Sequence, residues 1–99
     1  MSSDEQNAAI GRLALERAEL RKHRALIENE ASRIIHALND SCSEFLHYGL
    51  SFDRPKAISK IDAVIEMGGL GKLKELLAER EQISGKLSEV EGRASLVGI

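Results

Sequence analysis

The sequence predicts an all-α protein in which a long N-terminal helix folds against two shorter helices as a helical hairpin. Apolar residues recur every seven positions over the first forty residues, no proline precedes Pro55, and only 3% of the 99 residues are aromatic. A sustained seven-residue repeat is typical of a helix that buries one line of side chains against other helices. The length suits a single helical domain over residues 1–99.

The first helix is expected over about residues 4–47. Ser3 followed by Gln6 matches a capping box, and only Gly11 weakens the helix before residue 48. We interpret the seven-residue repeat as the seam of an oligomer, formed by Leu13, Leu20, Ile27 and Ile34. Further apolar residues fall outside this seam, at Leu15, Ala18, Leu26 and Ile35. A monomer would leave part of this surface in water, so we expect an oligomeric helical bundle.

The rest of the chain is expected to form a turn, two helices and a tail. A turn over 49–54 leads into a second helix over about 55–67, because Pro55 fits a first helical turn. Glycines then predict a break over 68–71, since each weakens a helix by about 1 kcal/mol relative to alanine. A third helix over about 72–91 is expected to end at Gly92, leaving a tail over 92–99.

Each of the two shorter helices carries an apolar face that we expect to point inward. In the second helix this face comprises Ile58, Ile61, Val64 and Ile65. In the third helix it comprises Leu73, Leu76, Leu77, Ile83, Leu87 and Val90.

Composition narrows the location and the chemistry. The net charge of −2 gives no overall attraction to nucleic acid or to anionic membranes. The single cysteine, Cys42, excludes a disulfide framework and a cysteine-based zinc site, and we expect it to be buried and reduced. The N-terminus is polar and acidic, unlike a signal peptide, and no apolar run reaches the roughly 20 residues that span a bilayer. We therefore expect a cytoplasmic protein without a cofactor or a metal.

The most suggestive cluster is basic. Arg17, Arg21 and Arg24 share one face of the first helix, and Arg80 occupies an expected seam position of the third. We favour ion pairs between helices, with Glu28, Glu75, Glu79 or Glu81 as partners. The alternative is an anion site, where guanidinium groups bind a nucleotide phosphate or an acidic partner helix.

The three aromatic residues gather at the expected turn. Phe45, Tyr48 and Phe52 would close the tip of the hairpin by packing on Ile58 and Ile61. The alternative is that Tyr48 and Phe52 anchor a protein partner, since aromatic residues dominate interface hot spots.

A polar face near residue 40 contains the residue types of a catalytic site. His36, Asp40, Ser43 and His47 follow one another at helical spacing. One continuous helix supplies neither an oxyanion hole nor a strained nucleophile, so we interpret this face as solvated. The sequence therefore favours a protein that is not an enzyme.

We predict a small interaction protein that binds and blocks or scaffolds another macromolecule, in the manner of a phage or mobile-element regulator or inhibitor. Its partners would be further copies of itself and a protein. One alternative is an oligomer that sequesters a nucleotide in interface pockets lined by arginines. A second alternative, which we rank lower because acidic residues interrupt the basic cluster, is a regulator that binds nucleic acid.

Overall fold

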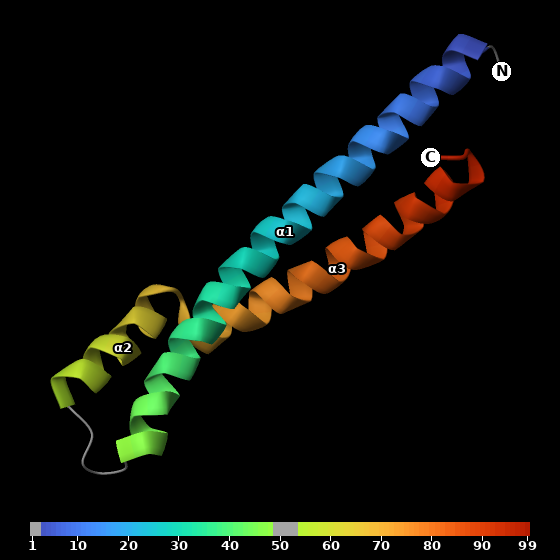
Figure 1. The fold of residues 1–99 in the computed structure, drawn as a ribbon. Coiled ribbons are helices and arrows are strands. Elements are labelled where there is room, and N and C mark those ends of the chain that lie inside the picture. The colour runs from blue at the N-terminus through green and yellow to red at the C-terminus, as the bar shows by residue number, and fades with distance from the viewer. Residues whose placement is uncertain (1–2, 49–53) are drawn as a thin grey trace. The chain divides into compact units, whose positions relative to one another are not determined.

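A computed structural model of the chain describes residues 3–48 and 54–99, apart from the side chains of residues 44, 45, 48 and 54. It contains three helices, α1 (Ser3–Tyr48), α2 (Arg54–Glu66) and α3 (Gly69–Leu96), shown in Figure 1. Within the described residues there is no strand. The all-α fold class predicted from the sequence is therefore confirmed.

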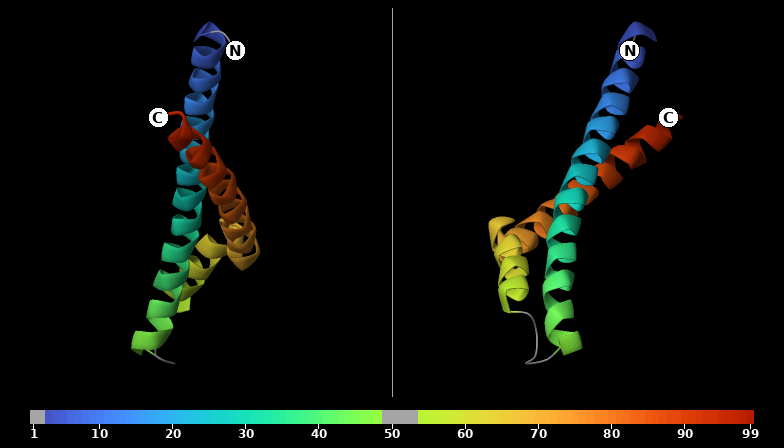
Figure 2. Two further views of the ribbon diagram at one scale, coloured as in Figure 1. Left: turned by 90° about the vertical axis from the view of Figure 1, so that its right-hand side faces the viewer. Right: turned by 60° about the vertical axis from the view of Figure 1, so that its left-hand side comes forward.

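Helix α1 is continuous over 46 residues, close to the predicted 4–47. Asp4 and Glu5 occupy its first turn, where negative charge interacts favourably with the helix dipole. The helix continues without interruption past Ser41 (Figure 2), whose hydroxyl donates a 3.0 Å hydrogen bond to the carbonyl oxygen of Ala37. That bond satisfies the hydroxyl within the helix, so Ser41 can be buried there.

The break between α2 and α3 is shorter than predicted. Only residues 67 and 68 separate the two helices, and Gly71 lies inside α3. Gly68 and Gly69 have φ of +99° and +64°, a conformation that residues with a Cβ rarely adopt. A Cβ on Gly68 would lie 2.5 Å from the Cβ of Lys72. The turn therefore requires glycine at position 68 for two separate reasons.

Helix α3 also continues past Gly92, where the sequence predicted its end. It stops at Leu96, and Gly98, with φ of +79°, closes it. The Ile99 amide donates to the Ala94 carbonyl oxygen at 2.9 Å, and the Gly98 amide to that of Ser95 at 3.2 Å. This is a Schellman motif. The burial of Val90 and Ala94 on either side of Gly92 offsets the cost of a helical glycine.

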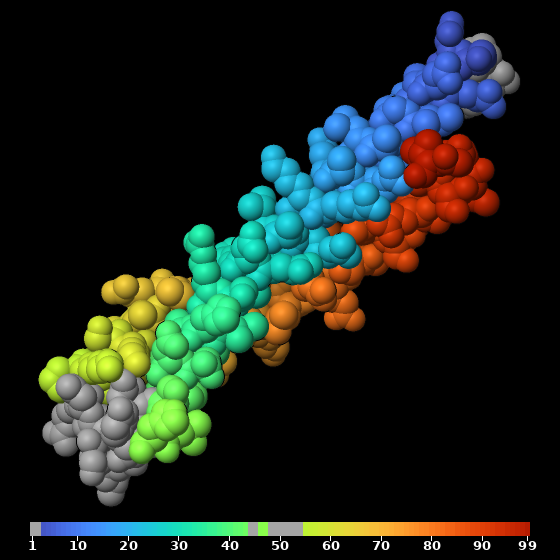
Figure 3. All heavy atoms as spheres, viewed as in Figure 1, coloured from blue at the N-terminus to red at the C-terminus, as the bar shows by residue number. Residues whose placement is uncertain are grey.

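The contacts of the chain form two compact units, Met1–Ile27 with Glu79–Ile99, and Glu28–Ala78. In the first unit, α1 and α3 run antiparallel, since Arg21 pairs with Glu91 and Arg17 with Ile99. The space-filling view shows the last turn of α3 against the part of α1 that belongs to the first unit (Figure 3). In the second unit, α2 lies beside the last turns of α1.

The four residues of the seam predicted in α1 differ in how deeply they are buried. Ile27 and Ile34 are buried within the single chain, whereas Leu13 and Leu20 are half-buried. The first two therefore belong to the core of the chain, and only Leu13 and Leu20 remain open to the predicted oligomer seam. The apolar residues expected to fall outside the seam are exposed, namely Leu15, Ala18, Leu26 and Ile35.

Candidate interaction surface

Arg17, the first residue of the predicted basic cluster, contacts the end of α3. Its Nη1 donates a 2.8 Å hydrogen bond to the backbone carbonyl oxygen of Ile99. Ile99 lies three residues beyond Leu96, the last residue of α3, so the bond reaches the segment that closes the helix. Arg17 therefore has a structural role, because it holds the Schellman turn against α1.

Arg21 forms the interhelical ion pair that the sequence led us to favour, but with a different partner. Its Nε and Nη2 lie 3.3 and 2.9 Å from one carboxylate oxygen of Glu91. His23 lies beside Glu79, with 3.3 Å between Nε2 and Oε1. Both pairs are about half exposed, and such pairs contribute at most about 1 kcal/mol each.

The other two predicted arginines differ in burial. Arg24 is half-buried, whereas Arg80 is exposed. Arg17 and Arg21 line a recess of about 340 Å³ together with Glu91 and Ser95. Because the Glu91 carboxylate already lies against Arg21, this recess supports the structural interpretation of the cluster more than an anion site.

The residues predicted at the hairpin tip fall outside the described part of the chain. Tyr48 ends α1 without a described side chain, and Phe52 lies in the segment between α1 and α2. Their role as aromatic anchors stays a prediction. Cys42, expected to be buried, is exposed, because the buried line through Ile34 continues to Ser41 and the next residue points about 100° away from it.

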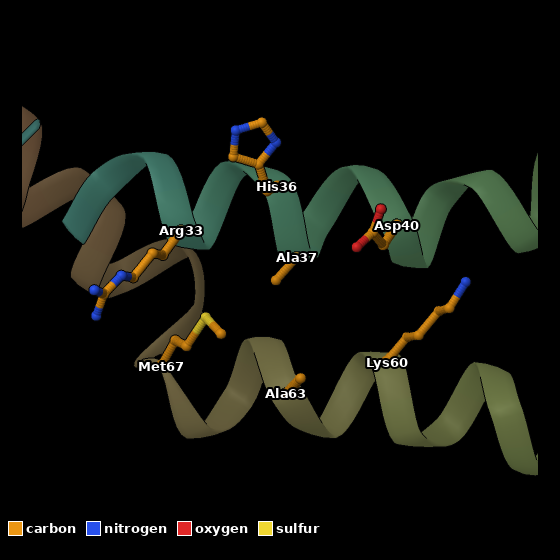
Figure 4. Close-up of a pocket in the computed structure, with 7 residues that line it drawn as sticks. All are labelled: Arg33, His36, Ala37, Asp40, Lys60, Ala63 and Met67. Atoms are coloured by element: carbon orange, nitrogen blue, oxygen red, sulfur yellow. The ribbon is translucent and has the colours of Figure 1, made fainter. Parts of the chain in front are cut away.

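The polar residues of α1 line part of a cavity of about 340 Å³ between α1 and α2. Figure 4 shows the Lys60 side chain of α2 extending toward α1 to one side of Asp40, while the His36 ring lies on the side of α1 away from α2. Within the described residues, no three His, Cys, Asp or Glu side chains group as metal ligands. Lys60 and Asp40 therefore line the same cavity from different helices.

A surface that the sequence did not predict lies along α2 and the start of α3. Six large apolar side chains are exposed there, which we call the 58–77 strip: Ile58, Ile61, Ile65, Met67, Leu70 and Leu77. Their exposed fractions range from 37% at Ile61 to 67% at Leu70.

The prediction that these residues point inward is wrong for three isoleucines of α2 and for Leu77 of α3. In α2 the buried residues are Ala57 and Val64, which lie seven positions apart on one line of the helix. Ile58 and Ile65 each follow one of them, and successive residues point about 100° apart around a helix. Burying the small Ala57 therefore turns the isoleucines toward solvent.

The later part of α3 contains a continuous line of buried apolar side chains, although Leu96 at its end is exposed. Ile83, Leu87 and Val90 are each 5% exposed or less. In residues 58–77, by contrast, only Val64 and Leu76 among the large apolar side chains are buried. Covering the part of each side chain that is still exposed would contribute only a fraction of the ~1.5–3 kcal/mol that full burial provides, and together these fractions are a source of binding energy that the single chain does not use.

The sequence did contain a signal for the strip. Ile58, Ile61 and Ile65 follow the spacing i, i+3, i+7, and Leu70, Leu73 and Leu77 repeat it. A second apolar line on α3, in addition to the line through Leu76 and Ile83, indicates that one helix has two faces to cover. The two lines together indicate more apolar surface on α3 than a single neighbouring helix covers.

Comparison with protein-family models, with curated protein sequences and with solved structures found no match to this chain. Of the helices in the described residues, none combines the length and apolar character needed to cross a membrane.

Proposed function

We propose that this chain is a small, non-enzymatic interaction protein that binds another protein chain through the 58–77 strip, and so blocks or scaffolds it. The observation that carries the proposal is the exposure of six large apolar side chains within twenty residues. Contiguous apolar surface on a folded protein most often marks an interaction site. The cytoplasmic location predicted from the sequence belongs to the same proposal.

The strip has the make-up of a helical docking surface. Its side chains are aliphatic or thioether groups carried on helices, which suit insertion between the side chains of a facing helix. Apolar burial would provide the affinity, while the charged residues beside the strip would select the partner. Arg17 and Arg21 contribute to the stability of the unit that contains them.

Photo-crosslinking from two positions on α2 tests this proposal. A benzoylphenylalanine placed at Ile65, in the strip, should give discrete cross-linked protein species in cells that express the chain. The same group at Lys56, which is exposed and lies on the side of α2 opposite Ile65, serves as the matched control and should give none. Adding Ile61→Asp to the strip variant should abolish the species, because a buried carboxylate opposes docking. If position 65 yields no adduct, the proposal is wrong.

A further inference from the structure

We infer that the chain covering the 58–77 strip is a second copy of this protein, and that α2 of each copy packs on the first turns of α3 of the other. This inference rests on the proposed function, because it names the occupant of the same surface. Three features of α2 and α3 support it: matched spacing, complementary charge and symmetry.

The α2 line of the strip matches in length and spacing an α3 line that runs from Leu70 to Leu77 of the strip through the half-buried Leu73. Ile58, Ile61 and Ile65 on α2 span two helical turns with intervals of three and four residues. Leu70, Leu73 and Leu77 on α3 span two turns with the same intervals. Two lines of equal length can interdigitate along their whole extent, which is the geometry of coiled-coil packing.

The charges beside the two lines are opposite. Asp62 and Glu66 each follow an isoleucine of the α2 line by one residue, so both lie on the same edge of it. Lys74 follows Leu73 in the same way, and therefore lies on the corresponding edge of the α3 line. All three are exposed, and none forms an ion pair with another described residue.

These unpaired charges favour one arrangement over its alternative. Packing α2 antiparallel on α3 of the second copy places the acidic edge beside Lys74, because antiparallel helices bring together the edges that follow each apolar line. Packing α2 on α2 would bring the acidic edges of two copies together, and like charges at an interface are unfavourable. In a two-fold symmetric dimer each α2–α3 contact occurs twice, so any favourable pair contributes twice.

Charge reversal tests the inference directly. Sedimentation velocity over a range of concentrations would measure the dimer dissociation constant of the full chain. Asp62→Lys and Lys74→Asp should each raise it by about tenfold or more, because each creates two like-charge pairs. The double variant should return within about threefold of the unchanged chain. Glu75→Lys, on an exposed part of α3 away from the Leu70 line, is the control and should change it less than twofold.

The possible outcomes separate this inference from the proposed function. A chain that stays monomeric, while position 65 still cross-links to a different protein in cells, overturns the second copy and leaves the interaction role intact. If Asp62→Lys and Lys74→Asp each weaken the dimer but the double variant does not restore it, the α2–α3 arrangement is overturned. The arrangement is also overturned if neither variant weakens the dimer. Absence of both self-association and adducts overturns both proposals. Circular dichroism of each variant verifies that the helices are retained.

Discussion

Arg17 and Ile99 are 82 positions apart in the chain, yet a 2.8 Å hydrogen bond joins the guanidinium group of one to the backbone carbonyl oxygen of the other. The bond fixes the last turn of α3 to α1 at the point where Gly98 ends the helix. Because this bond joins the segment that closes α3 to α1, we attribute the place of Arg17 in the sequence to this contact.

Replacing Arg17 with alanine should loosen the end of α3 without unfolding the protein. The Schellman turn would lose its contact with α1, so the Ile99 amide, which donates to Ala94, should exchange its hydrogen about threefold to tenfold faster. Hydrogen exchange followed by NMR measures this rate. Arg12→Ala, at an exposed position on the same helix, should leave the exchange rate of the Ile99 amide unchanged. Equal rates in both variants would show that Arg17 does not hold the end of α3 against α1.

The Arg21–Glu91 pair should contribute little to global stability. Both side chains are about half exposed, so water and salt screen the 2.9 Å interaction. A double-mutant cycle with Arg21→Ala and Glu91→Ala should give a coupling energy of about 0.2–1 kcal/mol, smaller at high salt. A coupling above about 2 kcal/mol, unaffected by salt, would be incompatible with so exposed a pair.

Alanine at two nearby glycines should have opposite effects on stability. Gly68→Ala should destabilise the fold by more than about 1 kcal/mol, because the residue has φ of +99° and its Cβ would collide with Lys72. Gly71→Ala should stabilise by about 0.5–1 kcal/mol, since Gly71 is helical and nothing lies within 4 Å of its Cβ position. Urea unfolding measures both, and effects of the same sign would contradict this description of the turn.

Adjacent isoleucines on α1 should differ sharply in their contribution to stability. Ile34 is 1% exposed and Ile35 is 49% exposed. Ile34→Ala should cost about 2–5 kcal/mol through lost burial and the cavity left behind, whereas Ile35→Ala should cost less than about 1 kcal/mol. Similar costs measured by chemical unfolding would show that the inward face of α1 has been assigned incorrectly.

The sequence predicted the helices well because their signals are local. The seven-residue apolar repeat and the Ser3 capping box identified α1 to within a residue at each end. Pro55 marked the start of α2 for the same reason, since its fixed φ suits a first turn. The end of α3 was harder to predict, because Gly92 and Gly98 look alike in sequence. Only the packing of Val90 and Ala94 decides between them.

The surface could not be predicted in the same way, because it depends on which line of each helix meets its neighbours. Ile58 and Ile65 are more apolar than Ala57, and periodicity alone places the larger side chains inside. The structure buries Ala57 instead. The pairing of Arg21 with Glu91 likewise depends on the offset between α1 and α3, which no single helix encodes.

We propose that the 58–77 strip is a protein-binding surface and that a second copy of the chain occupies it. Sedimentation equilibrium of the unchanged chain and of Ile65→Asp tests this proposal most directly, with Asn29→Asp, at an exposed position of α1, as the control for added charge. We predict a dimer for the unchanged chain and for Asn29→Asp, and a folded monomer for Ile65→Asp. An Ile65→Asp chain that dimerises as strongly as its control would contradict the proposal.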